Sequence, residues 1–327
     1  MKILMEPSTL SILAIAFSLG GLAVLSAALF FRSSRIEKDL YASEKVVRTV
    51  SPTFHEAISK VRGEGKRRIL YALDAVTKTV DRLVDHKDDP NGLEAFEKSL
   101  LYLIEKRSVD RTVLRSLKHI RRRLEKNYEF AEFFTIIGAR KRDFEHKGFQ
   151  TIDDLYSYGN DVHGASIAVL VRPFAKRFDQ RIKDCVEELG RAMTITRTLR
   201  MVGDDYRMER IHLPRNAMTK ARYLSYELRH AVINDSFIAL FEDLAKRAEA
   251  DFDHVLERIG CFPRALRRMI TYLAVTDKKR IEACRKDGYE VFYQNHELDR
   301  ATRERCYREY RKNRRKTMRK AKDNHER

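Results

Sequence analysis

The chain has 327 residues, of which 43% are hydrophobic and 35% charged, and this hydrophobic share excludes a chain that is disordered throughout. Pro (6) and Gly (13) are scarce and no long segment alternates polar with apolar residues, which excludes a β-rich protein and predicts an all-α fold. The formal net charge of +18 calls for a polyanionic partner, and nucleic acid, an anionic bilayer and a diphosphate-bearing substrate are the three candidates.

The first distinct element is an apolar run. After a short segment of residues 1–9, residues 10–31 (LSILAIAFSLGGLAVLSAALFF) contain no charge. As a helix, this run crosses a hydrocarbon core of about 30 Å, whereas the apolar region of a cleaved signal peptide, the competing interpretation, is about half as long. Arg32, Arg35 and Lys38 follow it, so the positive-inside rule predicts a single-pass membrane protein with its main domain in the cytoplasm.

The rest of the chain divides into three parts. Residues 32–45 are predicted to be a polar juxtamembrane linker, and residues 46–300 a helical domain, because apolar residues recur every three or four positions. Polar breaks fall near 87–92, 145–152 and 214–217. Residues 301–327 form a basic C-terminal tail, in which RKNRRKTMRKAK (311–322) has eight basic residues and no acid. Such a run is usually solvated or disordered, but it can also attract anionic lipid headgroups, by about 1 kcal/mol per charge.

A first acidic pair lies in KRRILYALDAVTKTVDRLVDHKDD (66–89). Asp81 and Asp85 are four residues apart, so a helix projects both carboxylates from one face. Two such carboxylates can share Mg²⁺, which keeps most of its waters and bridges to phosphate oxygens. A solvated helix face beside Arg82 is the plain alternative, because this spacing is common in a highly charged chain.

A second acidic pair lies in LGRAMTITRTLRMVGDDYRMERIHLP (189–214). Arg197, Met201 and Asp205 follow one another at four-residue spacing and form one helical stripe, with Asp204 beside it. If the two helices face each other, four acids would ring one cavity mouth: Asp81, Asp85, Asp204 and Asp205. Direct cationic contacts to a diphosphate would come from Lys78, Arg200, Arg207 and Arg210.

Over about residues 45–300 the chain resembles the squalene/phytoene synthases, a family of head-to-head prenyltransferases. SPTF (51–54) is similar to the family's Ser-x-Ser-Phe element, and residues 136–164 resemble a stretch that runs from Gly-Met-x-x-Asp to Tyr-Cys-Tyr-x-Val-Ala-Gly. The second acidic pair resembles Leu-Thr-Asn-Ile-Leu-Arg-Asp-Val-Gly-Glu-Asp, which runs on to Arg-x-Tyr-Leu-Pro. The match runs without gaps through Leu199, Arg200, Val202, Gly203, the acid pair, Arg207, Arg210, Leu213 and Pro214.

The resemblance implies an isoprenoid synthase fold with helices around a deep apolar pocket. It implies Mg²⁺-assisted ionisation of an allylic diphosphate, of farnesyl or geranylgeranyl type, and coupling of two such molecules through a cyclopropyl intermediate to a carotenoid- or squalene-type hydrocarbon. The implied catalytic acids are Asp81, Asp85, Asp204 and Asp205, with Asp81, Asp85 and Asp205 as metal ligands. The implied diphosphate-binding residues are Lys78, Arg197, Arg200, Arg207 and Arg210, and the implied pocket residues are Phe54, Tyr158, Val162 and Gly164.

The departures from the family pattern matter as much. The family's Asn falls on Arg197 and its first Asp on Met201, and a thioether is a poor ligand for Mg²⁺ while a guanidinium repels it. Further replacements are Arg82 for an Asp, Lys78 for an Arg, Asp74 for a Tyr, His163 for an Ala, Ile167 for a Gly and His212 for a Tyr. The site therefore holds a reduced metal set, or the chain is a catalytically impaired binding or assembly protein at the membrane.

Two further features have plain interpretations. His163 is either a packed, satisfied histidine or a proton carrier, and Asp143, at the acid of Gly-Met-x-x-Asp, is either a site residue or a partner in a packing salt bridge. No helix-turn-helix signature occurs, nor any basic run interleaved with stacking aromatics, so no nucleic-acid partner is expected.

Overall fold

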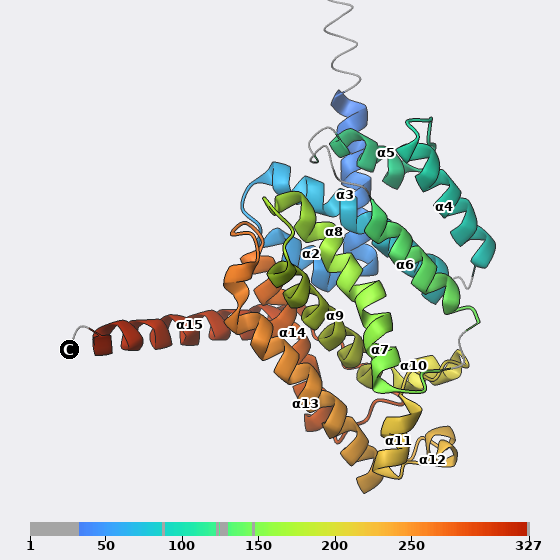
Figure 1. Ribbon diagram of the computed structural model, residues 1–327, viewed down its shortest axis with the longest axis vertical. Coiled ribbons are helices and arrows are strands. Elements are labelled where there is room, and N and C mark those ends of the chain that lie inside the picture. The colour runs from blue at the N-terminus through green and yellow to red at the C-terminus, as the bar shows by residue number, and fades with distance from the viewer. Residues whose placement is uncertain (1–32, 87–88, 122–123, 125–129, 146–147, 326–327) are drawn as a thin grey trace, which may run out of the picture.

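The computed structural model describes residues 33–86, 89–121, 124, 130–145 and 148–325 (Figure 1). All regular secondary structure in these residues is helical, which confirms the predicted all-α class. After a first helix of residues 33–50, the α-helices are α2 (Pro52–Ser59), α3 (Glu64–Asp81), α4 (Pro90–Ile104), α5 (Thr112–Ile120), α6 (Ala131–Arg142), α7 (Ile152–Gly159), α8 (Ala165–Val171), α9 (Gln180–Arg200), α10 (Val202–Arg207), α11 (Arg215–Ala221), α12 (Ser225–Arg229), α13 (Asp235–Glu257), α14 (Arg267–Lys286) and α15 (Arg300–His325). The predicted break near 145–152 falls between α6 and α7, whereas residues 215–217 of the break predicted near 214–217 belong to α11 and only Pro214 precedes that helix. Residues 87–88 of the remaining break lie outside the described part of the chain.

Helix α9 is the centre of the bundle. It packs against α7, α13 and α14, and most of its side chains from Ile182 to Arg200 are buried. Gly190 of α9 is the point of closest approach, because a Cβ there would lie 2.5 Å from the backbone nitrogen of Gly164. Gly164 is therefore a packing position against α9.

Two short π-helical turns interrupt the bundle. Residues Arg82–His86 continue α3 and carry Asp85, and residues Asn160–Gly164 join α7 to α8 and carry His163. A π-turn is rare and is frequently found at a functional site. Both turns contribute a side chain to the same cavity, described below.

The prediction of a polar linker at residues 32–45 is wrong for its described part. Residues 33–50 form a helix whose Leu40 and Val47 are buried in the core. Asp39 of this helix is also buried, and its carboxylate pairs with Arg115 at 2.9 Å and lies 3.0 Å from His119 Nε2, both from α5. These contacts fix the helix to the domain, so the domain begins before residue 46.

The predicted apolar anchor, residues 10–31, lies outside the described residues. Within the described part of the chain, no helix combines the length and the apolar character that crossing a membrane requires.

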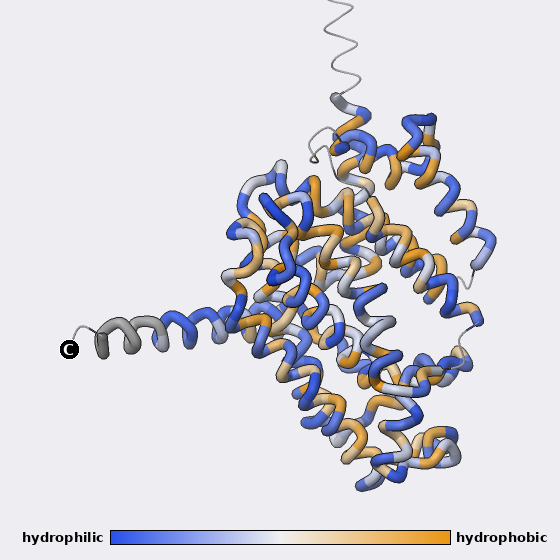
Figure 2. Tube along the Cα trace, in the orientation of Figure 1, coloured by the Kyte–Doolittle hydropathy of each residue, from blue (hydrophilic) through white to orange (hydrophobic). Residues whose placement is uncertain are grey.

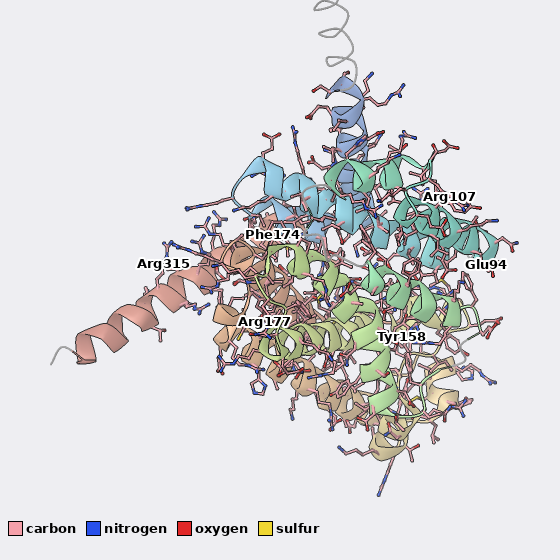
Figure 3. The ribbon with its side chains drawn as sticks, turned by 45° about the horizontal axis from the view of Figure 1, so that its top comes forward. Glu94, Arg107, Tyr158, Phe174, Arg177 and Arg315 are labelled. Atoms are coloured by element: carbon pink, nitrogen blue, oxygen red, sulfur yellow. The ribbon has the colours of Figure 1, made fainter. Side chains whose placement is uncertain are left out.

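The C-terminal segment is a helix, which corrects the expectation of a tail that starts at residue 301. The first turns of α15 belong to the core, where Arg303, Cys306 and Tyr307 are buried. Beyond them α15 projects from the body as a hydrophilic helix (Figure 2), and Arg315 lies on this projecting part (Figure 3).

Candidate active site

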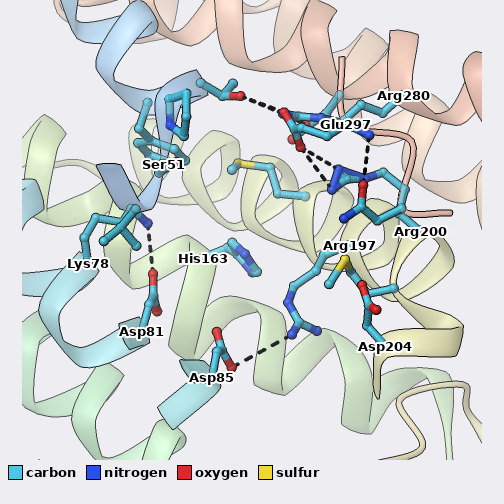
Figure 4. A pocket seen from close by; sticks show the side chains of 18 of the residues that line it. Ser51, Lys78, Asp81, Asp85, His163, Arg197, Arg200, Asp204, Arg280 and Glu297 are labelled. Carbon is cyan, nitrogen blue, oxygen red and sulfur yellow. Dashed lines mark hydrogen bonds and ion pairs between the residues drawn. The ribbon is translucent and has the colours of Figure 1, made fainter. Parts of the chain in front are cut away.

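A cavity of about 610 Å³ opens beside α3, α9, α10 and α14 (Figure 4). Its charged lining residues are Lys78, Asp81, Asp85, Arg197, Arg200, Asp204, Arg207, Asp277, Arg280 and Glu297. Its apolar lining residues are Val50, Pro52, Phe54, Met193, Met201, Met208 and Leu273. The five basic and five acidic side chains cancel in formal charge, so each expected metal ligand or diphosphate contact has to be judged by its existing partner.

Asp81 stands at the end of α3 and is paired with Lys78. The Lys78 ammonium lies 3.0 Å from Asp81 Oδ2 and 4.4 Å from the centre of the Phe54 ring. Although burial opposes the charged form, Asp81 and Asp74 raise the pKa of Lys78, so this ammonium stays protonated. The structure thus brings together three predicted residues: a catalytic acid, a diphosphate-binding cation and a pocket aromatic.

Asp85 lies among three guanidinium groups. Its Oδ1 is 2.5 Å from Arg140, 3.6 Å from Arg210 and 4.0 Å from Arg197. Burial raises the pKa of Asp85, but the arginines outweigh burial and hold it well below its usual range. The carboxylate is therefore ionised, and its charge is already compensated by the protein.

Arg140 is the first of several residues of this site that were not predicted from the sequence. It is 3% exposed and lies 2.5 Å from both Asp85 and Asp143, 3.7 Å from Asp81 and 3.0 Å from the Tyr158 hydroxyl. A signal was present in the resembling element Gly-Met-x-x-Asp, because counting back from Asp143 places its Met at position 140. An uncharged side chain of the family pattern is thus replaced by a buried cation.

Asp205 does not join the other acids at the cavity mouth, which corrects the expected ring of four. Helix α9 ends at Arg200 and α10 begins at Val202, and Asp205 is only 2% exposed behind this break. It accepts hydrogen bonds from Arg197 at 3.2 and 3.3 Å, and its Oδ2 lies 2.6 Å from His212 Nδ1. Burial raises the pKa of Asp205, but Arg197 and His212 outweigh burial and hold this pKa below its usual value.

The expected magnesium site on Asp81, Asp85 and Asp205 does not fit this arrangement. Among the described residues, no three His, Cys, Asp or Glu side chains are placed to hold one metal ion. The physical reason is that Lys78, Arg140 and Arg197 occupy the space beside these carboxylates and already neutralise them. A requirement for Mg²⁺ stays a prediction.

The remaining predicted cations divide into two groups. Arg200 and Arg207 line the cavity, and Arg207 pairs with Asp204 and donates to the Phe292 carbonyl at 2.9 Å. Arg210 is buried outside the cavity lining, where it supports Asp85. The structure therefore places Lys78, Arg197, Arg200 and Arg207, but not Arg210, at the cavity.

Among the predicted pocket residues only Phe54 lines the cavity. The Tyr158 hydroxyl accepts from Arg140 at 3.0 Å and donates to Asp143 at 2.8 Å, and Tyr158 is not part of the cavity lining. Val162 is buried outside the lining, and Gly164 packs against α9. Tyr158, Val162 and Gly164 are therefore packing residues outside the cavity lining.

His163 lines the cavity and has a defined tautomer. The Thr194 hydroxyl donates its single hydrogen to the Gly190 carbonyl at 2.8 Å, so His163 Nδ1, 2.8 Å from that hydroxyl oxygen, must be the donor. Burial lowers the pKa of His163 to about 3, and the charges of Lys78 and Arg197 contribute to this shift. The ring is neutral and packed, and it has an acceptor at Nε2.

Three further charged residues of the cavity, Asp277 and Arg280 of α14 and Glu297 of the segment before α15, were not predicted from the sequence either. Arg200 Nη1 and Arg280 Nη2 lie 3.0 and 2.5 Å from the carboxylate of Glu297. No sequence signal distinguished them, because Arg280 follows two lysines in a mixed-charge helix and Glu297 lies outside the motifs.

Comparison with known proteins gives consistent results. The sequence model of the squalene/phytoene synthase family matches residues 47–305. The 4,4'-diapophytoene synthase of Staphylococcus haemolyticus (strain JCSC1435) is 21% identical over 263 residues, which cover 79% of this chain and 91% of that protein. The farnesyl diphosphate phosphatase YisP of Bacillus subtilis (strain 168) is 26% identical over 164 residues, 50% of this chain and 60% of that protein. The crystal structure of a dehydrosqualene synthase in complex with ligand superposes with a TM-score of 0.79 at 25% identity, over 85% of this chain and 97% of that one, and this superposition confirms the expected fold.

Proposed function

The chain belongs to the squalene/phytoene synthase family of head-to-head isoprenoid synthases, and from this membership we propose that it is a prenyltransferase that joins two polyprenyl diphosphates and releases pyrophosphate. Farnesyl and geranylgeranyl diphosphate are the proposed substrate types. The hydrocarbon product would be of the carotenoid or squalene class.

The observation that carries the proposal is the meeting of cations and apolar side chains in one cavity. Lys78, Arg197 and Arg207 line the cavity and can donate hydrogen bonds to phosphate oxygens. The guanidinium groups of the two arginines can bind phosphate in a bidentate manner. Phe54 and Leu273 belong to the apolar part of the same lining. A molecule with an anionic head and a hydrocarbon chain matches both parts.

In the proposed reaction the bond between the allylic carbon and its oxygen breaks, and both electrons leave with the diphosphate. The ammonium of Lys78 and the guanidinium groups of Arg197 and Arg200 would stabilise the departing negative charge. The apolar lining would keep water from the allylic cation until a double bond of the second polyprenyl diphosphate attacks it and a proton is lost as a cyclopropane closes. Departure of the second diphosphate, followed by loss of a second proton, would then give the hydrocarbon. No step is assigned to a metal, because the carboxylates already have basic partners.

We further propose that the protein works at a membrane, with its main domain in the cytoplasm. The apolar run of residues 10–31 supports an anchor, and a hydrocarbon product has to leave into a bilayer. The projecting part of α15 would add electrostatic attraction, because five of its basic residues lie at helical spacing on one face. These residues are Arg308, Arg311, Lys312, Arg315 and Lys316.

The test is turnover by the full-length protein in detergent micelles. Farnesyl and geranylgeranyl diphosphate are supplied in Mg²⁺ or in EDTA, and pyrophosphate and hydrocarbon are measured. The variant Lys78→Met should lose most of the release, whereas Lys220→Met, which changes an exposed lysine paired with Asp243, should not. If the folded protein releases no pyrophosphate from either substrate in either buffer, the proposal is refuted. Formation of a prenyl alcohol without coupled hydrocarbon would show that the protein is a hydrolase and not a transferase.

A second candidate function is binding of a prenyl diphosphate without transfer. It is favoured by the ion pairs that Arg140 and Arg197 make with Asp85 and Asp205, because these carboxylates are the expected metal ligands. A prenyl diphosphate that raises the melting temperature in EDTA while no pyrophosphate appears would support this candidate. Release of pyrophosphate would exclude it.

A further inference from the structure

One wall of the cavity holds two buried arginines on a single carboxylate (Figure 4). The carboxylate of Glu297 lies 3.0 Å from Arg200 and 2.5 Å from Arg280. It also lies 3.2 Å from the buried Arg303 of α15, which is outside the cavity lining, and the Thr53 hydroxyl donates to it at 3.5 Å. Arg200 and Arg280 are 9% and 7% exposed, whereas the side chain of Glu297 is 46% exposed. The cations are thus fixed in the wall, and the anion is the accessible partner.

The guanidinium groups of these two arginines are not fully hydrogen-bonded within the protein. The Nε atoms of Arg200 and Arg280 are both buried without a hydrogen-bond partner. Burial and the neighbouring charge of Arg280 lower the pKa of Arg200 to about 10. Asp277 is already paired with Arg280, and among the described residues no carboxylate other than Glu297 forms an ion pair with Arg200. Arg200 therefore depends on Glu297 for its counter-ion.

The segment that carries Glu297 is held at both ends but is irregular between them. At one end, Gly203 donates to the Val291 carbonyl at 3.2 Å, and a Cβ on Gly203 would lie 1.8 Å from the Phe292 carbonyl oxygen, so the segment lies directly on α10. At the other end α15 begins at Arg300. Residues 293–298 form no helix, so the Glu297 side chain can turn away from Arg200 and Arg280 without unwinding an element. Its ion pair with Arg303 at 3.2 Å has to break or to follow in that movement.

We propose that Glu297 is a latch: its carboxylate takes the place of a ligand phosphate at Arg200 and Arg280, and a diphosphate binds there by displacing it. The inference rests on the proposed function only in taking the ligand to be a diphosphate. Carboxylate and phosphate oxygens accept the same pair of guanidinium donors, so the exchange replaces one anion by another. The latch lowers the apparent affinity for anions, because the binding-competent state is only part of the population.

The test is the affinity of the full-length protein for inorganic pyrophosphate in EDTA, measured by isothermal titration calorimetry. The variant Glu297→Gln removes the competing charge and should bind about tenfold more tightly than the wild type. The matched control is Glu304→Gln, which removes a charge from the same end of the chain but from an ion pair with Lys60 outside the cavity. The control should bind like the wild type. Adding Arg200→Met to Glu297→Gln should abolish the gain.

Three outcomes would overturn the latch: equal affinity of Glu297→Gln and the wild type, an equal gain in the control, or no binding by either protein. Hydrogen–deuterium exchange of the wild type gives a second measurement that does not depend on a variant. Saturating pyrophosphate should raise exchange in residues 293–298, and unchanged or lowered exchange would contradict displacement. If Glu297→Gln binds pyrophosphate more tightly but the wild type shows no prenyl turnover, the latch is supported and the transferase proposal is refuted. If the wild type turns over prenyl diphosphates but the two affinities are equal, the transferase proposal is supported and the latch is refuted.

Discussion

Arg140 supplies a direct test of the charge arrangement around Asp85, through the variant Arg140→Met. Of its three carboxylate neighbours, Asp81 keeps Lys78 at 3.0 Å and Asp85 keeps Arg210 at 3.6 Å. Asp143 loses its ion pair and keeps the Tyr158 hydroxyl at 2.8 Å. Removing one partner of a buried ion pair costs about 3–5 kcal/mol. Because Asp143 is the one acid left without an ion pair, we expect Arg140→Met to lower the free energy of unfolding by about 3 kcal/mol. At about 2 °C per kcal/mol for a chain of this size, the melting temperature should fall by about 6 °C.

The matched control is Arg142→Met, two residues further along the same helix. Arg142 is paired with Asp161 at 2.8 Å, but its side chain is 60% exposed, so its removal should change stability by about 0.5 kcal/mol or less. Both variants are compared with the wild type by thermal unfolding of the full-length protein in the same detergent. Equal melting temperatures for the two variants, or a more stable Arg140→Met, would refute the view that Arg140 is a required counter-ion.

Three further predictions concern other parts of the molecule. The pKa of His163 is about 3 in the folded state and 6.5 in the unfolded state, so between these pH values only the unfolded chain gains a proton. Lowering the pH from 7 to 5 should therefore reduce the unfolding free energy of the wild type by about 2 kcal/mol more than that of His163→Ala. An equal pH dependence of the two proteins would contradict this. In vesicles that contain phosphatidylserine, residues 308–317 should gain protection from hydrogen exchange relative to phosphatidylcholine vesicles and lose it in 0.5 M salt, and the same result in both lipids would remove the proposed role of the basic face. Gly190→Ala should lower the melting temperature by several degrees, about 1–3 kcal/mol, because its Cβ would meet the backbone of Gly164, and an unchanged melting temperature would show that α9 can shift.

The helical period predicts the middle of the fold well and the ends poorly. Between residues 46 and 300 the apolar spacing correctly predicts helices, because a helix that packs on a core repeats every 3.6 residues, but of the predicted break at 214–217 only Pro214 lies outside α11. The helix of residues 33–50 escapes this reasoning, since its buried Asp39 is made acceptable by Arg115 and His119 from a helix far along the chain. Periodicity describes one helix at a time, whereas such pairing depends on how two helices meet.

In the candidate site, likewise, many residues could be predicted from the sequence but their interaction partners could not. Asp81, Asp85, Asp204 and four of the five predicted cations were identified by their type and spacing. The position of Asp205 was not, because one non-helical residue, Met201, separates α9 from α10, so that Arg197 and Met201 line the cavity while Asp205 lies outside its lining. Arg140 was missed because its meaning depends on Asp85, which lies 55 positions earlier in the sequence.

Asp85 shows why an intact signature residue does not by itself indicate intact chemistry. Arg140, Arg210 and Arg197 lie beside this carboxylate, at 2.5, 3.6 and 4.0 Å, and the first two of these arginines are buried. A buried guanidinium without a counter-ion is strongly destabilising, so losing Asp85 would harm the fold whether or not a metal ever binds. Two of these arginines stand where the resembling family elements have Met and Asn, and each makes Asp85 more necessary as a structural anion. The acid is therefore explained by the cations around it, and the case for transfer chemistry depends on the cavity cations and on measured turnover.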